Sequence, residues 1–156
     1  MSGTKTIDEA FLDACNNGDK AKVNAAIVLG VDINTKNSEG RTGLYLAIWN
    51  INEHIVDILL ELPGIDINRK TNKGGFPLLV AAYHGLSSVV AKLGMMPGLR
   101  GVNDQAGDGG LTPLSLAARF GKDNNLQFRQ FCEAECFILV KKKDILKILA
   151  VQSSNS

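Results

Sequence analysis

A repeat with a period of about 34 residues limits how this chain can fold more than any other feature. Asp32-Ile33-Asn34 returns 34 residues later as Asp66-Ile67-Asn68, and a weaker copy, Gly101-Val102-Asn103, follows after another 35. Periods of roughly 20–50 residues indicate structural units that stack in one direction. Such a unit cannot bury its apolar face alone, so neighbouring units must share one continuous core.

A second marker keeps the same phase and predicts where helices begin. Gly40-Arg41-Thr42-Gly43-Leu44 returns as Gly74-Gly75-Phe76-Pro77-Leu78 and as Gly110-Leu111-Thr112-Pro113-Leu114. Glycine permits the positive φ of a loop tip, threonine caps a helix, and proline suits the first helical turn. An alanine lies three residues after each leucine, where we expect close helix packing: Ala47, Ala81 and Ala117.

Two helices are predicted in each unit. The second is indicated by apolar runs at 55–60 and 89–93, each followed by a Pro-Gly pair that ends it. Glycine occupies the turn between the two helices at Gly18, Gly85 and Gly121. Ile51 holds the same place in the first full unit.

The period and two stretches, Leu111 to Ala118 and Gly64 to Asn68, resemble ankyrin repeats. The resemblance is clear over residues 6–121 and covers about four units. It implies an all-α ankyrin-repeat solenoid of stacked helix–turn–helix pairs joined by protruding β-hairpin loops. We expect a single domain over residues 1–156, with units at about 6–36, 37–70, 71–106 and 107–151.

The last unit departs from this pattern after Gly121. An apolar-rich segment follows at 126–140, and the pattern of a second helix returns only at 144–149. An insertion of about 20 residues explains this spacing, and so does one long capping helix from about Asn124 to Val151. In both cases we predict an atypical helical segment over 122–151 that covers the open end of the stack.

Composition argues against several classes of protein. Lys and Arg number 17 against 16 Asp and Glu, a net charge of +1, so we expect no nucleic acid partner. The longest uncharged apolar run near the end is far shorter than the ~18 residues of a membrane span, so we expect no membrane insertion. Three cysteines are too few for a disulfide scaffold and suggest a reducing compartment. We expect a monomer in the cytoplasm, with the nucleus as the alternative.

No arrangement of residues indicates catalysis. His54 and His84 are the only histidines and form no His-Glu-x-x-His pair, while Cys132 and Cys136 make half a metal site. We therefore predict a non-catalytic protein with no metal and no cofactor. The distant alternative is an enzyme whose site lies in the irregular C-terminal segment. Glu133, Glu135, Asp144 and the two cysteines are available there, but no histidine is.

The resemblance implies a protein–protein interaction module, because ankyrin-repeat proteins mostly bind other proteins through hairpin tips and the concave face of the first helices. In the ankyrin-repeat pattern, the last two residues of each first helix, just before the turn to the second helix, project towards the hairpins. From the second unit on, this pair of residues contains an aromatic side chain. These pairs are Trp49-Asn50, Tyr83-His84 and Arg119-Phe120. The hairpin tips add Ser38, Glu39, Arg41, Asn72, Lys73, Asp108 and Leu111.

Two alternatives stay open for this predicted face. The partner, an unidentified protein, could be an enzyme, which would make the chain a regulatory inhibitor or a targeting adaptor. Trp49 and Tyr83 could also serve only to pack neighbouring repeats together, since isolated exposed aromatic residues are common.

Overall fold

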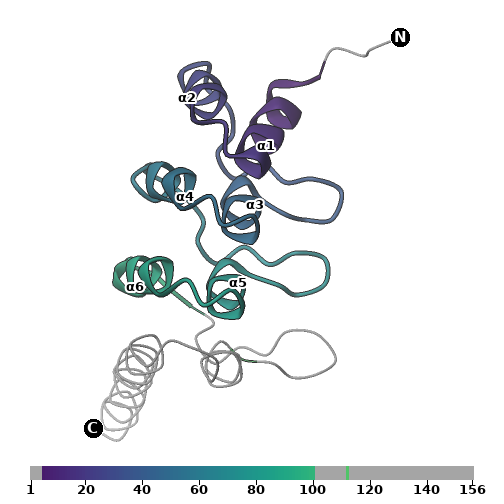
Figure 1. The fold of residues 1–156 in the computed structure, drawn as a ribbon. Helices are drawn as coiled ribbons and strands as arrows, with labels where there is room; N and C mark the ends of the chain where they lie inside the picture. The colour runs from purple at the N-terminus through teal and green to yellow at the C-terminus, as the bar shows by residue number, and fades with distance from the viewer. Residues whose placement is uncertain (1–4, 101–111, 113–156) are drawn as a thin grey trace, which may run out of the picture.

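The computed structural model describes residues 5–100 and 112. Three helix–turn–helix pairs stack along one direction in this part of the chain (Figure 1). The helices are α1 (Ile7–Asn17), α2 (Lys20–Val28), α3 (Gly43–Trp49), α4 (Glu53–Leu60), α5 (Pro77–Tyr83) and α6 (Ser87–Met95). The first helices α1, α3 and α5 form a layer beside the long loops, and α2, α4 and α6 form the outer layer (Figure 1).

The core runs between the two layers without a break. The first helices α1, α3 and α5 each pack on the second helix of their own unit. Helix α1 also packs on α3, α3 on α5, and α2 on α4. Leu44 and Leu78 are buried at equivalent places, and Ala47 and Ala81 are fully buried, as the repeat frame predicts. The expected all-α repeat fold is therefore confirmed.

The predicted helix starts are also found. The N–H of Tyr45 donates to the Thr42 hydroxyl oxygen at 3.3 Å, which caps α3. Pro77 stands in the first turn of α5, where its missing N–H costs no hydrogen bond. Phe76 precedes it and supplies no side-chain cap.

Gly43, where another unit has proline, is required by packing. A Cβ atom at this position would lie 2.8 Å from Cε1 of Phe11 and 2.9 Å from Sγ of Cys15. Both of those side chains are fully buried and have no room to move. Glycine therefore lets α3 approach α1 closely.

Ile51 adopts a left-handed backbone conformation at the predicted turn between helices. Its φ is 59°, close to the 72° of Gly18 and the 67° of Gly85 at the same place in neighbouring units. A β-branched residue in this conformation costs on the order of 1–2 kcal/mol, since its Cβ crowds the backbone. The turn geometry is thus imposed by the stack on an unfavourable residue.

The loops that join the units are tight turns with very short arms. A single antiparallel bridge pairs Lys36 with Thr42, and the described residues contain no strand. In the next loop the N–H of Thr71 donates to the C=O of Gly75 at 2.7 Å. The expected β-hairpins are therefore shorter than predicted. Most residues of each loop form the turn itself, and few residues remain on either side to pair as strands.

The asparagine of each Asp-Ile-Asn triplet joins its unit to the next one. Nδ2 of Asn34 donates to the C=O of Gly64 at 2.9 Å, and its Oδ1 accepts from the N–H of Asp66 at 2.8 Å. Asn68 makes the same two bonds with the main chain of the following unit, at 3.0 and 2.7 Å. The triplet recurs because it holds successive loops in register.

The irregular last unit, predicted over 107–151, lies outside the described residues. Its helical segment 122–151, the two explanations for that segment, and Ala117 therefore stay predictions. Within residues 5–100, no helix combines the length and the apolar character needed to cross a bilayer.

Candidate functional site

Three aromatic rings from two neighbouring units lie parallel to one another beside the loops. The ring centroids of Tyr45 and Trp49 are 6.2 Å apart with an interplanar angle of 8°. Trp49 and Tyr83 are also 6.2 Å apart, at 1°. Tyr45 and Trp49 belong to α3 and Tyr83 to α5, so the stack crosses from one unit to the next. Together with His84, these residues are called the aromatic stripe.

His84 meets the stripe edge-on. Its ring centroid lies 5.4 Å from that of Trp49 and 5.1 Å from that of Tyr83, at interplanar angles of 83° and 84°. Its Nε2 is buried and has no hydrogen-bond partner in the described part of the chain. Burial lowers the pKa of this imidazole, so the neutral form packs against the rings at pH 7.

The stripe is exposed at its centre and buried at one end. Trp49 is 41% exposed and Tyr83 44%, although both are large hydrophobic side chains. Tyr45 is buried, and burial raises the pKa of its phenol. The rings therefore stack across neighbouring repeats and still present their surface to solvent.

Arg41 connects the stripe to the loop that precedes α3. Its Cζ lies 6.0 Å from the Tyr45 ring centroid and 5.8 Å from that of Trp49, within the range of cation–π attraction. Its Nη1 is 2.9 Å from a carboxylate oxygen of Glu39. The guanidinium group therefore interacts both with the Glu39 carboxylate and with the rings of Tyr45 and Trp49.

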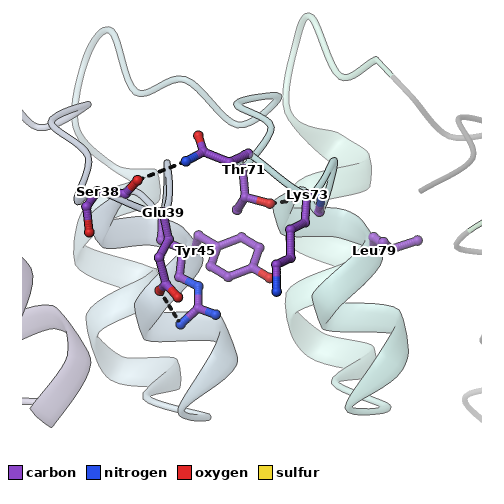
Figure 2. A pocket seen from close by; sticks show the side chains of 9 residues that line it. Ser38, Glu39, Tyr45, Thr71, Lys73 and Leu79 are labelled. Carbon is purple, nitrogen blue, oxygen red and sulfur yellow. Dashed lines mark hydrogen bonds and ion pairs between the residues drawn. The ribbon is translucent and has the colours of Figure 1, made fainter. Parts of the chain in front are cut away.

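A groove of ≈ 310 Å³ opens between this loop and the next one (Figure 2). The loops are joined by two bonds from Asn72, whose N–H donates to the C=O of Glu39 at 3.0 Å and whose Nδ2 donates to the C=O of Ser38 at 2.8 Å. The groove is lined by Ser38, Glu39, Arg41, Tyr45, Thr71, Asn72, Lys73, Gly75 and Leu79. Because Arg41 and Tyr45 belong to both, groove and stripe form one surface.

Comparison with known families supports the repeat assignment. A family model of three ankyrin repeats matches residues 11–98, more than half of the chain. The chain belongs to the ankyrin-repeat family. A search of curated proteins gave no match. Ankyrin repeats are generally protein–protein interaction modules, and this general role does not specify a partner.

The ankyrin-repeat frame places most of the predicted site residues on this surface. Five of them line the groove: Ser38, Glu39, Arg41, Asn72 and Lys73. Trp49, Tyr83 and His84 form the stripe. Asn50 lies apart, because its Nδ2 donates to Oδ1 of Asn16 and to the C=O of Leu46, both at 2.9 Å. Four predicted residues lie outside the described part: Asp108, Leu111, Arg119 and Phe120.

Sequence reasoning missed four residues of this ankyrin-repeat surface, namely Tyr45, Thr71, Gly75 and Leu79. A signal for Tyr45 was present, because it precedes Trp49 by four residues and so shares its face of the helix. Thr71, Gly75 and Leu79 carry no such signal. They reach the groove only because the two loops lie side by side.

Reactive groups are scarce in the described part of this ankyrin-repeat chain. Residues 5–100 and 112 hold no group of three His, Cys, Asp or Glu side chains arranged to bind a metal. Cys15 is fully buried, and burial raises the pKa of its thiol to about 12, which suppresses the reactive thiolate. The C-terminal residues of the enzyme alternative lie outside the described residues.

Proposed function

We propose that the chain is a non-catalytic module that binds a protein partner through the aromatic stripe and the adjoining loops. The observation that carries this proposal is the half-exposed stack of Trp49 and Tyr83, continuous through Arg41 with the groove. Tryptophan, tyrosine and arginine are the residues most enriched among those that dominate binding energy at interfaces. The odd count of three cysteines supports a reducing compartment, the cytoplasm or the nucleus.

The surface is ordered in advance of binding. Stacking fixes the rings, and the ion pair with Glu39 fixes Arg41. Residues that are already held lose little conformational entropy when a partner arrives, so more of the contact energy appears as affinity. The exposed parts of Trp49 and Tyr83 offer an apolar area, and the polar loops beside it supply hydrogen bonds at its rim.

Capture of partners from a cell extract tests the proposal. The full chain and its Trp49→Ala variant would serve as baits, with bound proteins identified by mass spectrometry and their affinities then measured. Loss of a central aromatic anchor should weaken the partner by about 2 kcal/mol or more, roughly 30-fold. Circular dichroism of the variant should stay unchanged, because the Trp49 side chain is 41% exposed.

Val28→Ala is the matched control. Val28 is an apolar residue at the end of α2, is 85% exposed, and lines neither the groove nor the aromatic stripe. This change should leave capture intact. A partner that binds the Trp49→Ala variant as well as the wild type would show that the stripe is not the binding surface.

A further inference from the structure

The loops beside the aromatic stripe concentrate positive charge in a chain that is almost neutral. Residues 35–42 and 69–76 carry five basic side chains and one acidic side chain, although the whole chain has a net charge of only +1. The basic residues are Lys36, Arg41, Arg69, Lys70 and Lys73. Helix α4 in the outer layer, with its C-cap, shows the reverse, since it holds Glu53, Asp57 and Glu61 and no Lys or Arg. The other outer helices carry Lys20, Lys22 and Lys92, so the excess of positive charge is a local feature of residues 35–42 and 69–76, where Arg41 pairs with Glu39 and Arg69 with Asp66.

Two of these cations line the groove itself. Arg41 lies on the loop before α3 and Lys73 on the loop before α5, and the two loops are held together by the bonds of Asn72 (Figure 2). No carboxylate of the described residues forms an ion pair with Lys73, and its side chain is exposed. Within the described residues, the ammonium group of Lys73 therefore has no carboxylate bound to it, and the one carboxylate that lines the groove, that of Glu39, is paired with Arg41.

Arg41 keeps donors available for a ligand. A guanidinium carries five N–H groups, and the ion pair with Glu39 engages one terminal nitrogen. The backbone around it is braced, because Oδ1 of Asn37 accepts from the N–H groups of Glu39 and Arg41, both at 3.0 Å. The remaining edge of the guanidinium is therefore fixed in position, which favours the two parallel bonds that a carboxylate accepts.

We propose that the groove binds an acidic side chain of the partner protein between Arg41 and Lys73, with a neighbouring apolar side chain against the exposed part of Trp49. This proposal rests on the proposed function and specifies its ligand as a protein segment in which Asp or Glu adjoins an apolar residue. The groove volume of ≈ 310 Å³ is at the lower end of the range for ligand pockets, about 300–1,000 Å³, and suits one or two side chains.

The Glu39 carboxylate favours such a segment over nucleic acid. It lies in the same groove and would repel a phosphate chain that carries one charge at every step. Nucleic acid affinity comes from many phosphates neutralised at once. A single planar carboxylate needs only the free edge of Arg41 and the ammonium of Lys73, so it meets the repulsion of Glu39 once rather than at every step of a chain.

Selection from a random peptide library displayed on phage, with the immobilised full chain as target, tests this proposal. The consensus peptide would then be synthesised in an acidic form and in a form with Asn and Gln in place of Asp and Glu. Trp49 is the only tryptophan of the chain, so its fluorescence reports binding at the stripe directly when the peptides lack tryptophan. We expect an acidic–apolar consensus, and about 10- to 100-fold weaker binding of the amide form, as for loss of charge-assisted hydrogen bonds.

Charge reversal locates the contact. Lys73→Glu should weaken the acidic peptide by a similar factor, because it replaces the ammonium group with a repelling charge. Lys20→Glu makes the same change in net charge on an exposed residue of α2 in the outer layer and should have little effect. Both side chains are exposed, and circular dichroism would verify that the variants fold.

Contrary outcomes separate this proposal from the proposed function. A consensus without acidic residues, or unchanged affinity of Lys73→Glu, overturns the acidic-segment proposal, and a Trp49 response in the same titration would leave the stripe as the binding surface. Both proposals are overturned if the peptides bind without changing Trp49 fluorescence and if an anisotropy assay gives the same affinity for the wild type and for Trp49→Ala. Tighter binding of a single-stranded oligonucleotide than of the acidic peptide at the same salt concentration overturns the choice of a protein ligand.

Discussion

Gly43 shows how a single missing side chain can hold two units together. Gly43→Ala should lower the free energy of unfolding by about 1–3 kcal/mol, because the new methyl group would overlap the fully buried Phe11 and Cys15 side chains. Urea denaturation followed by circular dichroism measures this change. An unaltered midpoint would mean that α1 and α3 can move apart at no cost.

Gly94→Ala is the matched control for that substitution. Gly94 also lies in a helix, α6, but a Cβ atom there would have no neighbour within 4 Å. The change should raise the free energy of unfolding by about 0.5–1 kcal/mol, because alanine loses less backbone entropy than glycine on entering a helix. The same substitution therefore has opposite signs at the two positions.

His84 gives the molecule a stability that depends on pH. Burial against the aromatic stripe lowers the pKa of His84 below its ordinary value of 6.5, so the unfolded chain takes up a proton more readily than the folded one. The stabilising contribution of His84 is complete above pH 6.5 and is lost as the pH falls below that value. Urea midpoints measured between about pH 7.5 and 5.5 should therefore decrease, since this window brackets the unfolded pKa.

Substitution of each histidine identifies the source of that slope. His84→Gln should flatten the pH dependence within this window. His54→Gln removes the other histidine of the chain, whose Nε2 lies 3.0 Å from the C=O of Gly18, and serves as the control. If His54→Gln flattens the slope while His84→Gln leaves it unchanged, the buried imidazole is not its cause.

At the scale of the elements, the loops are held by side chains that bond to the next loop. Asn34→Ala should cost about 1–3 kcal/mol of unfolding free energy, because it removes the acceptor for the N–H of Asp66 and the donor to the C=O of Gly64. Hydrogen exchange of the Asp66 amide should become faster in the same variant. Both measurements address one contact between two units.

Asn24→Ala is the control for Asn34→Ala, because it makes the same substitution at an asparagine that joins no two of the described units. Asn24 is exposed in α2 and its side chain has no hydrogen bond in the described part of the chain. Alanine is the better helix former, so stability should stay the same or rise by less than about 0.7 kcal/mol. Equal losses in both asparagine variants would contradict the bridging role of Asn34.

Much of each element could be predicted from its own sequence. The apolar runs at 55–60 and 89–93 lie within α4 (Glu53–Leu60) and α6 (Ser87–Met95), and the turn at Ile51 lies where the period puts it. The loops were less predictable, because their expected hairpin ladders are reduced to one bridge in the described residues. Local patterns determine where a helix begins and ends, whereas loop pairing depends on the neighbouring loop.

At the scale of the whole molecule, the repeat order and the family could be predicted, but the geometry of the proposed binding surface only in part. Trp49 and Tyr83 were placed on it by their position before a turn. The parallel stacking of their rings was not, because it depends on how far one unit is displaced from the next. Nor was the position of Arg41 over the Trp49 ring. The covering role of residues 122–151 stays a prediction, since those residues lie outside the described part.

The bonds of Asn34 and Asn68 have a consequence for how such a chain can change over generations. Both asparagines address only the main chain of the following unit, a C=O and an N–H, and no side chain of it. At this joint, a duplicated or exchanged unit therefore needs only the same backbone path, whereas the helices between units still require matched side chains. Mutations can therefore change the side chains around this contact, and recombination can change the number of units. The hydrogen bonds from the asparagine to the main chain of the next unit can form in every case.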